Sequence, residues 1–259
     1  MPERSSFAPG TPSWVDLSTT DPDAARDFYG PLLGWEYVID PSEETGHYAT
    51  ATVGGKNVAG VNGMSITEQP PAWTTYFATD DAQKLSQLVT ENGGAIALGP
   101  MQVGPSGTML IWQDPSGAFA GAWQAGDMKG AQLVQEPGAI AWNELNTRDL
   151  AAAIAFYTAI LPVTAHDMSD GDFHYQTLQV DGADVAGMWE MSADVAPDVP
   201  PNWGVYFTVA DADASVTQAT SLGASVIVPV KDSPYGRLAG LRDPQGAAFY
   251  VIGMAFENQ

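Results

Sequence analysis

Two carboxylic acids, Asp16 and Glu144, occupy the same position in a repeated segment of the chain. Residues 14–35 read WVDLSTTDPDAARDFYGPLLGW, residues 142–163 read WNELNTRDLAAAIAFYTAILPV, and a shift of 128 makes nine of their positions identical. A carboxyl group enclosed by aromatic side chains has a raised pKa, and it can act as a general acid or base or pair with a cationic ligand. The alternative is a structural carboxylate that accepts hydrogen bonds from backbone amides or an indole, or a group between domains.

The repeated segment predicts a strand followed by a helix. Residues 14–19 alternate in the manner of a strand, which places Asp16 on the face opposite the residues that pack against the helix. Asp21 is typical of a helix N-cap, and Gly34 is typical of the residue that ends a helix. The helix between them has an apolar stripe with i, i+3, i+4, i+7 spacing, formed by Ala25, Phe28, Tyr29 and Leu32.

The remaining landmarks of the first half also recur in the second half. A hairpin is predicted around Gly54-Gly55-Lys56, and a second strand–helix unit begins at residue 73. DPxG turns at 114–117 and 243–246 are related by a shift of 129. Shifts of 127 to 130 indicate a tandem duplication, in which each half contains the order β-α-β-β-β twice. The predicted strands include residues 47–53, 57–64, 73–79, 95–103, 108–113 and 118–124, and then 174–180, 183–191 and 203–209.

Composition excludes several classes of partner and chemistry. Lys and Arg total 9 against 31 acidic residues, a net charge of −22 that repels nucleic acid and anionic membranes. The chain has no cysteine, which excludes disulfides, a thiolate nucleophile and cysteine-bound metals. It has no signal-peptide pattern and no run of about 18 apolar residues. We therefore expect a cytoplasmic protein, monomeric or homodimeric, that interacts with neither nucleic acid nor membranes.

The combined motifs resemble those of a known superfamily. A strand with an acidic residue, a helix carrying Phe-Tyr and a later DPxG turn before a final strand are similar to the glyoxalase/bleomycin-resistance/extradiol-dioxygenase proteins, also called vicinal oxygen chelate proteins, of the tandem two-domain actinobacterial type. The resemblance implies an α+β fold, with two βαβββ modules per domain forming a cup-shaped eight-stranded mixed sheet around a cavity. We expect domains at residues 12–126 and 139–255, joined by a linker at 127–138.

The same resemblance implies where a metal would be bound. Enzymes of the superfamily hold a divalent metal with His, Glu or Gln on the first and fourth strands of each module. The expected ligand positions are found by counting back from the Asp after the first strand of each module and forward from the Asp of each DPxG turn. This gives six positions, and none of them carries a side chain that usually binds a divalent metal. The one conceivable alternative set is Glu144, His174 and Glu190. We predict no metal and no cofactor. The six positions are Trp14, Trp142, Thr74, Gly204, Gly121 and Tyr250.

Histidine and aromatic residues provide the remaining candidates for a binding site. His47 and His174 correspond in the two halves, and each is either a proton shuttle or ligand contact in the cup or an exposed strand-end residue. Aromatic walls with a few polar groups suit a planar aromatic ligand, although ordinary core packing is the alternative. The predicted ligand contacts are His47, His174, Trp14, Trp142, Trp73, Trp203, Tyr76, Tyr206, Trp123 and Tyr250, with Asp16 and Glu144 as the catalytic candidates.

Two functions remain open from the sequence. The first is metal-independent binding of an aromatic or polyketide-like small molecule, for sequestration, resistance or natural-product handling. The second is a lyase, isomerase or hydroxylase-like enzyme that uses Asp16 or Glu144 as acid or base, with metal-dependent activity less favoured. Whether the protein is an enzyme is left open.

Overall fold

The computed structural model describes residues 3–43, 45–63 and 70–254. The predicted strand 57–64 and the predicted domain end at residue 255 each extend beyond the described residues. The first half contains β1 (Pro12–Thr19), α1 (Pro22–Leu33), β2 (Glu36–Ile39), β3 (Ala49–Val53), β4 (Lys56–Gly63), β5 (Ala72–Ala78), α2 (Ala82–Glu91), β6 (Ala95–Val103), β7 (Gly107–Gln113) and β8 (Phe119–Ala125). The second half contains β9 (Ile140–Thr147), α3 (Leu150–Ile160), β10 (Thr164–Asp167), β11 (Tyr175–Val180), β12 (Ala183–Glu190), β13 (Asn202–Val209), α4 (Ala212–Ser221), β14 (Ser225–Ser233), β15 (Gly236–Arg242) and β16 (Ala248–Met254).

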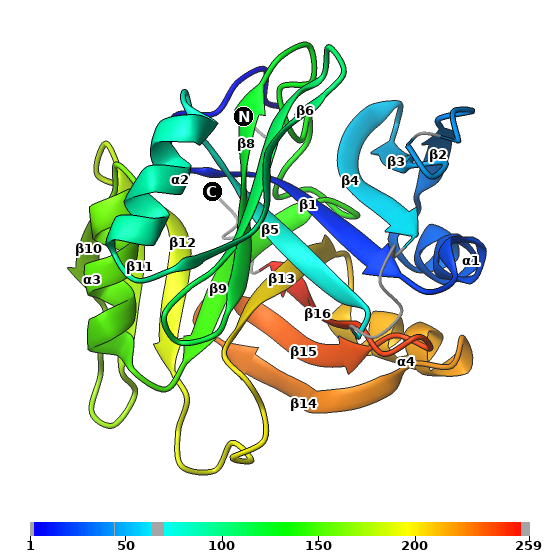
Figure 1. Ribbon diagram of the computed structural model, residues 1–259. Helices are drawn as coiled ribbons and strands as arrows, with labels where there is room; N and C mark the ends of the chain where they lie inside the picture. Colours follow the sequence, from blue (N-terminus) through cyan, green and yellow to red (C-terminus); the bar gives the residue numbers. More distant parts are fainter. Residues whose placement is uncertain (1–2, 44, 64–69, 255–259) are drawn as a thin grey trace.

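Each half forms one mixed sheet of eight strands. Figure 1 shows the strands of the two halves together with the helices. The strand orders are β2-β3-β4-β1-β5-β8-β7-β6 and β10-β11-β12-β9-β13-β16-β15-β14. In each sheet the first strands of the two βαβββ modules pair antiparallel, and each also pairs in parallel with the last strand of its own module. This arrangement confirms the predicted α+β fold with two tandem cup-shaped sheets.

The sequence located two of the three strands that follow the first helix in each half. The missing strands are β2 and β10, which have four residues each and lie at the edge of their sheets. Most of their residues are exposed. A short exposed strand lacks the alternation of apolar and polar residues on which the other predictions depended.

The predicted helix ends are confirmed. Asp21 and Asp81 each accept a hydrogen bond from a backbone N–H in the first turn, at Ala24 and Lys84 respectively. Gly34 ends α1 with a φ of 70°, in the left-handed region that glycine adopts without strain.

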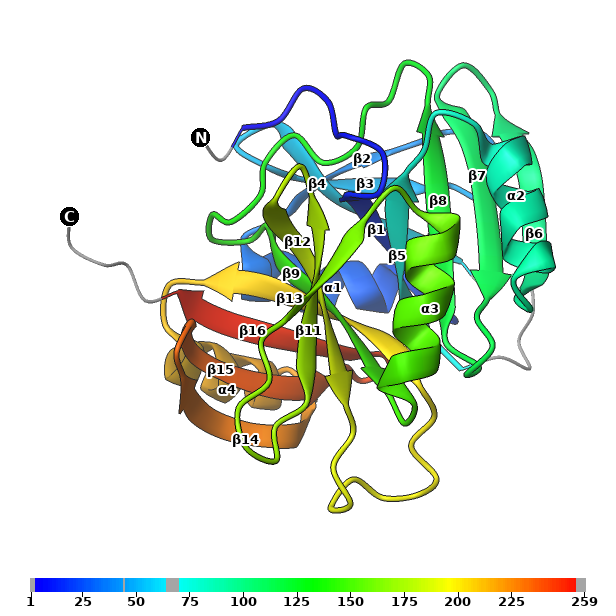
Figure 2. The same cartoon turned by 90° about the vertical axis from the view of Figure 1, so that its left-hand side faces the viewer.

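The two halves share their hydrophobic cores. α1 contacts α4, and α2 contacts α3, so that each half covers part of the other, as both cartoon views show (Figures 1 and 2). Phe28 packs edge-on against Phe249 with ring centroids 6.0 Å apart, and Phe77 packs edge-on against Trp203 at 5.1 Å. Each half therefore completes the core of the other, which the local patterns of the sequence do not show.

A reciprocal pair of hydrogen bonds accompanies the shared cores. The Tyr29 hydroxyl on α1 donates to Asp243 Oδ2 at 2.9 Å, and the Tyr157 hydroxyl on α3 donates to Asp114 Oδ2 at 2.9 Å. In each DPxG turn the Asp Oδ1 accepts three backbone N–H bonds from the turn itself. The two sequence motifs that identified the repeat therefore meet across the two halves.

No helix within residues 3–43, 45–63 and 70–254 is long and apolar enough to cross a membrane.

Candidate functional site

Asp16 and Glu144 lie in the middle of their sheets, on the face turned away from the helices, which we call the inner face. Asp16 on β1 is paired with Gly60 on β4 and Thr74 on β5. Glu144 on β9 is paired with Gly187 on β12 and with Gly204 on β13. Residues paired across neighbouring strands share a face, so the predicted orientation of both acids follows from the register.

In the first sheet Asp16 belongs to a network of aromatic hydrogen-bond donors. The Tyr76 hydroxyl donates to Asp16 Oδ1 at 3.3 Å, and the Tyr48 hydroxyl also bonds the carboxyl group. Trp14 Nε1 donates to the Tyr48 hydroxyl at 2.9 Å. The carboxyl is therefore held from two sides by hydroxyls, one of which is fixed by an indole.

The second sheet contains the same network with one difference in residue type, because Glu144 lies at the position of Asp16. The Tyr206 hydroxyl donates to Glu144 Oε1 at 2.9 Å, and the Tyr175 hydroxyl bonds the same carboxyl group. Trp142 Nε1 donates to the Tyr175 hydroxyl at 3.1 Å. The duplication has preserved the Trp–Tyr–acid–Tyr arrangement as a unit, and only the acid differs.

A glycine on the neighbouring strand makes room for each network. A Cβ atom at Gly60 would lie 1.8 Å from the Tyr48 hydroxyl oxygen, and one at Gly187 would lie 1.9 Å from the Tyr175 hydroxyl oxygen. Real Cβ atoms do not approach so closely, so any larger residue would displace these tyrosines. The two glycines therefore position the tyrosine that links indole and carboxyl.

Burial shifts the proton equilibria of both networks. Removal from water raises the pKa of Asp16 to about 7, although the hydrogen bonds from Tyr76 and Tyr48 lower it. Burial likewise raises the pKa of Glu144, against lowering contributions from Tyr206 and Tyr175. The tyrosine hydroxyls also have raised pKa values, because they are buried beside an acid, and they remain donors at neutral pH.

The two networks differ in access to solvent. In the first sheet Trp14, Asp16 and Tyr76 are buried, and Tyr48 is half-buried. In the second sheet Tyr175 and Tyr206 are buried, and Trp142 and Glu144 are half-buried. The acid and the indole of the second network therefore have atoms that a ligand from solution can contact, whereas those of the first network are enclosed.

An additional aromatic residue lies beside the second network. Tyr206 stacks on the half-buried Tyr250, with ring centroids 4.4 Å apart and an interplanar angle of 13°. The corresponding partner of Tyr76 in the first sheet is Gly121, which has no ring to offer. Of these two equivalent positions, only the one in the second sheet therefore provides a pair of stacked rings as a flat aromatic surface.

Two of the predicted ligand contacts, Trp73 and Trp203, lie away from the inner face. Both lie on the outer face, buried between the two halves. Trp73 Nε1 donates to the Tyr29 hydroxyl at 3.0 Å, and Trp203 Nε1 donates to the Tyr157 hydroxyl at 2.8 Å. Both indoles therefore bond the tyrosines of the reciprocal Tyr–Asp pairs, and neither belongs to an inner-face network.

The two predicted histidines also lie outside the networks. His47 and His174 are both exposed, and each immediately precedes the tyrosine that bonds the acid. The dipeptide His-Tyr thus recurs in the two halves, and the predicted ligand contacts include only its histidine. Tyr48 and Tyr175 are the functional candidates that it missed, and their correspondence by a shift of 127 was the signal that could have found them.

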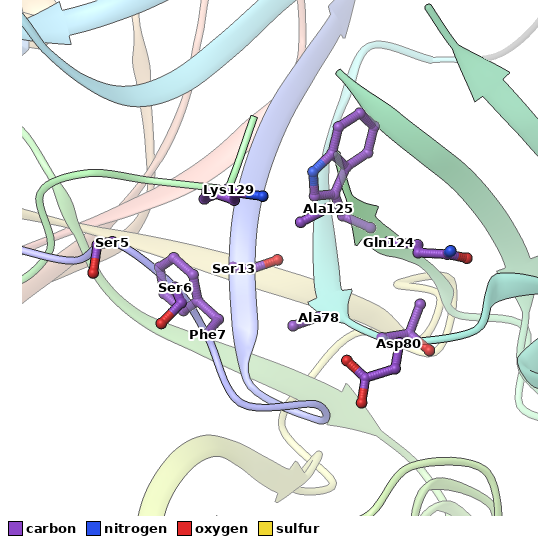
Figure 3. Close-up of a pocket in the computed structure, with 11 residues that line it drawn as sticks. Ser5, Ser6, Phe7, Ser13, Ala78, Asp80, Gln124, Ala125 and Lys129 are labelled. Carbon is purple, nitrogen blue, oxygen red and sulfur yellow. The ribbon is translucent and has the colours of Figure 1, made fainter. Parts of the chain in front are cut away.

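Trp123 lies at a separate hollow near the end of β8. A cavity of about 320 Å³ is lined by Trp123 together with the N-terminal arm, the ends of β1 and β5, and the segment after β8, as Figure 3 shows for its labelled residues. Trp123 Nε1 donates to the Met128 carbonyl at 2.8 Å. The indole is thus occupied by the chain itself, and Trp123 is not part of the hydrogen-bonded network around Asp16.

The comparison with known families agrees with this geometry. The model of the Glyoxalase/Bleomycin resistance protein/Dioxygenase superfamily matches residues 11–119 and 132–251. The chain belongs to this superfamily. The putative glyoxylase CFP32 of Mycobacterium tuberculosis is 41% identical over 258 residues, covering 97% of this chain and 98% of the relative. The anthracycline biosynthesis protein DnrV of Streptomyces peucetius is 38% identical over 260 residues, covering 95% and 94%.

Solved structures of the superfamily share the fold at low sequence identity. A Mn(II)-bound glyoxalase from Novosphingobium aromaticivorans has a TM-score of 0.65 at 16% identity, covering 95% of this chain and 82% of its own. The 2,2',3-trihydroxybiphenyl 1,2-dioxygenase of Sphingomonas wittichii strain RW1 has a TM-score of 0.63 at 9% identity, covering 95% and 91%. At such identities the likeness establishes the fold alone.

The inner-face residues do not fit the divalent metal that the superfamily implies. A catalytic metal needs three or more ligand groups, and no three His, Asp or Glu residues gather within the described part of the chain. Each network offers one carboxyl and tyrosine hydroxyls that hold their protons. Glu190 lies on β12 three residues from the inner-face Gly187, so it faces away from Glu144. His174 Nδ1 lies 3.9 Å from Glu190 Oε2 and not in the Glu144 network.

Proposed function

We propose that the protein binds a planar aromatic small molecule on the inner face of its second sheet, without a metal. The observation that carries this proposal is the network of Trp142, Tyr175, Glu144 and Tyr206, whose indole and acid are half-buried beside the stacked Tyr250. Aromatic rings provide a flat apolar surface, and an offset aromatic pair contributes roughly 0.5–1.5 kcal/mol beyond its buried area. The fixed carboxyl then selects a ligand that has a complementary polar group.

The carboxyl group supplies the polar contact in this site. Because Tyr206 and Tyr175 hold Glu144 in place, a ligand does not have to order it on binding, and this lowers the entropic cost. Burial raises the pKa of Glu144, so the carboxyl takes up a proton more readily than an exposed one, and a protonated carboxyl both donates and accepts hydrogen bonds. The name of the anthracycline biosynthesis relative supports a role in handling a natural product, through binding, sequestration or resistance.

A pair of matched variants tests the proposal. Glu144→Gln removes the acid from the second network, and Asp16→Asn makes the equivalent change in the buried first network. Loss of a half-buried hydrogen-bonding carboxyl costs about 1–2 kcal/mol, so we expect Glu144→Gln to weaken binding roughly 5- to 30-fold and Asp16→Asn to leave it within about twofold. The measurement is isothermal titration with a panel of anthraquinones. Equal effects of the two variants would contradict the assignment of the second site.

A second candidate function is acid–base catalysis at the same carboxyl groups. The observation that favours it is the raised pKa of Asp16, about 7, since a general acid or base works best when its pKa lies near the working pH. On this hypothesis an enolisable or quinone-like compound would be altered rather than only bound. Mass spectrometry of each bound compound after incubation separates the two functions. Recovery of every compound unchanged supports binding, and a new product that disappears in Glu144→Gln or Asp16→Asn supports the enzyme.

A further inference from the structure

The second inner face carries a lysine that the first lacks. Lys231 on β14 is paired with Leu238, and Leu238 is paired with Ile252, both of which lie in the aromatic cluster of the second inner face. The equivalent pair in the first sheet is Met101 and Met109. The positively charged side chain of Lys231 in the second sheet thus lies at the position of the Met101 thioether in the first.

Lys231 is available to a ligand. Its side chain is exposed, and it has no hydrogen-bond or ion-pair partner among residues 3–43, 45–63 and 70–254. Its charge lies close enough to Glu144 to lower the pKa of that carboxyl, although burial still raises the pKa overall. The nearby Arg237, by contrast, is already paired with Asp213 and Asp232.

Two exposed aromatic residues accompany Lys231. Phe173 is 49% exposed and stacks on Tyr175, with ring centroids 5.3 Å apart and an interplanar angle of 14°. Tyr235 is 60% exposed at the tip between β14 and β15, near enough to Tyr175 to affect its pKa. Both exposed rings thus lie near Tyr175, and large exposed apolar groups gathered at one place are typical of a surface that a ligand covers.

The corresponding residues of the first repeat carry no rings. Phe173 corresponds to Gly46 by a shift of 127, and Tyr235 corresponds to Ser106 by a shift of 129. The Ser106 carbonyl accepts hydrogen bonds from the backbone of Gly126 and Met128, so that tip is already bonded to the segment that follows β8. We call Phe173, Lys231 and Tyr235 the second rim.

We propose that the second rim selects planar aromatic ligands that carry an anionic group, with Lys231 as the counter-ion and Phe173 and Tyr235 in contact with the ring system. This inference rests on the proposed function and narrows its ligand class. The overall charge of −22 opposes the approach of any anion. At an ionic strength of about 0.15 M, charges beyond about 8 Å are largely screened, so a local cation decides whether an anionic group is accepted.

A matched pair of probes tests this selection. Anthraquinone-2-carboxylate and anthraquinone-2-carboxamide have nearly the same shape and differ in charge. Isothermal titration at about 0.15 M salt should show the carboxylate binding about fivefold more tightly than the carboxamide, as expected for a partly desolvated ion pair. Lys231→Met should remove that preference and leave carboxamide affinity within about twofold. Tyr235→Ser, which introduces the residue of the first repeat, should weaken both probes.

The charge control is Lys84→Met, which removes an exposed lysine on α2 of the first half. It should keep the carboxylate preference. If wild type binds both probes alike, or if Lys231→Met keeps the preference, the rim does not select by charge, and the proposed binding function stands. If wild type binds neither probe nor any other planar aromatic compound, the proposed function itself is wrong.

Discussion

Asp16 is a carboxylic acid buried among aromatic rings, and its protonation is coupled to folding. Its pKa is about 7 in the folded chain, above the value of 3.8 for a free side chain. Between these two pH values the folded state binds a proton that the unfolded state has released. The free energy of unfolding therefore receives a contribution from Asp16 that falls as pH rises from about 4 through about 7.

We predict that Asp16→Asn removes this dependence. A shift of about three pKa units corresponds to about 4 kcal/mol, so the variant should be more stable than wild type by about 2–4 kcal/mol at pH 8 and of similar stability at pH 4. Urea unfolding at both pH values measures the difference. Asp198→Asn, at an exposed position, is the matched control and should change stability by less than about 0.5 kcal/mol at either pH. A constant difference between wild type and Asp16→Asn would contradict the raised pKa.

At the scale of single residues, the strand pattern gives the face on which the acids lie, but not which aromatic residues lie beside them. The strand period of two puts Asp16 and Glu144 on the inner face, as their cross-strand pairing shows. The same period separates Trp73 from Tyr76, because residues three apart point to opposite faces. Both were predicted to contact ligand, and only Tyr76 lies on the inner face. Partners such as Tyr48 depend on pairing between strands, which no local pattern reveals.

At the scale of elements, the Phe-Tyr helix and the DPxG turn form a connection between the halves. Tyr29 on α1 accepts from the Trp73 indole and donates to Asp243, and Tyr157 on α3 does the same with Trp203 and Asp114. These groups lie between helices and turns of different halves. Removing one hydroxyl would leave both an indole donor and a carboxylate acceptor without that partner.

We therefore predict that Tyr29→Phe and Tyr157→Phe each destabilise the protein by about 1–3 kcal/mol, because buried polar groups lose a partner. Chemical denaturation followed by tryptophan fluorescence measures the loss, and it should show one transition for both halves. Tyr37→Phe is the control, since the Tyr37 hydroxyl is buried without a hydrogen-bond partner in the described structure and its removal should cost little. Equal effects at Tyr29 and Tyr37 would contradict the role of the connection.

The sequence predicted these helices and turns, but it did not predict that those of one half pack against the other half. Helix caps and apolar stripes are local, so the ends of α1 and α2 and their buried faces could be read from spacing. Which sheet a helix packs beside is not local. The duplicated motif was sufficient to identify the repeat, and it could not show that Tyr29 bonds a turn 214 residues away.

At the scale of the molecule, duplication has produced two similar networks with different surroundings. In the first network the acid and the indole are buried, and the neighbouring hairpin tip at Ser106 is bonded to the segment that follows β8. In the second network the acid and the indole are half-buried, and Tyr250 and the second rim lie beside them. We infer that the first network serves mainly to support the fold, and that the second binds the ligand.

Tryptophan fluorescence titration in the presence of a chelator shows which of the two networks binds the ligand. Trp142 lies in the second network and Trp14 in the first, so they report on the two sites separately. We predict saturable quenching by anthraquinone-2-carboxylate at one equivalent per chain, with EDTA present. The quenching should be largely lost in Trp142→Phe and retained in Trp14→Phe. Binding that requires an added metal, or quenching that depends on Trp14 instead of Trp142, would contradict it.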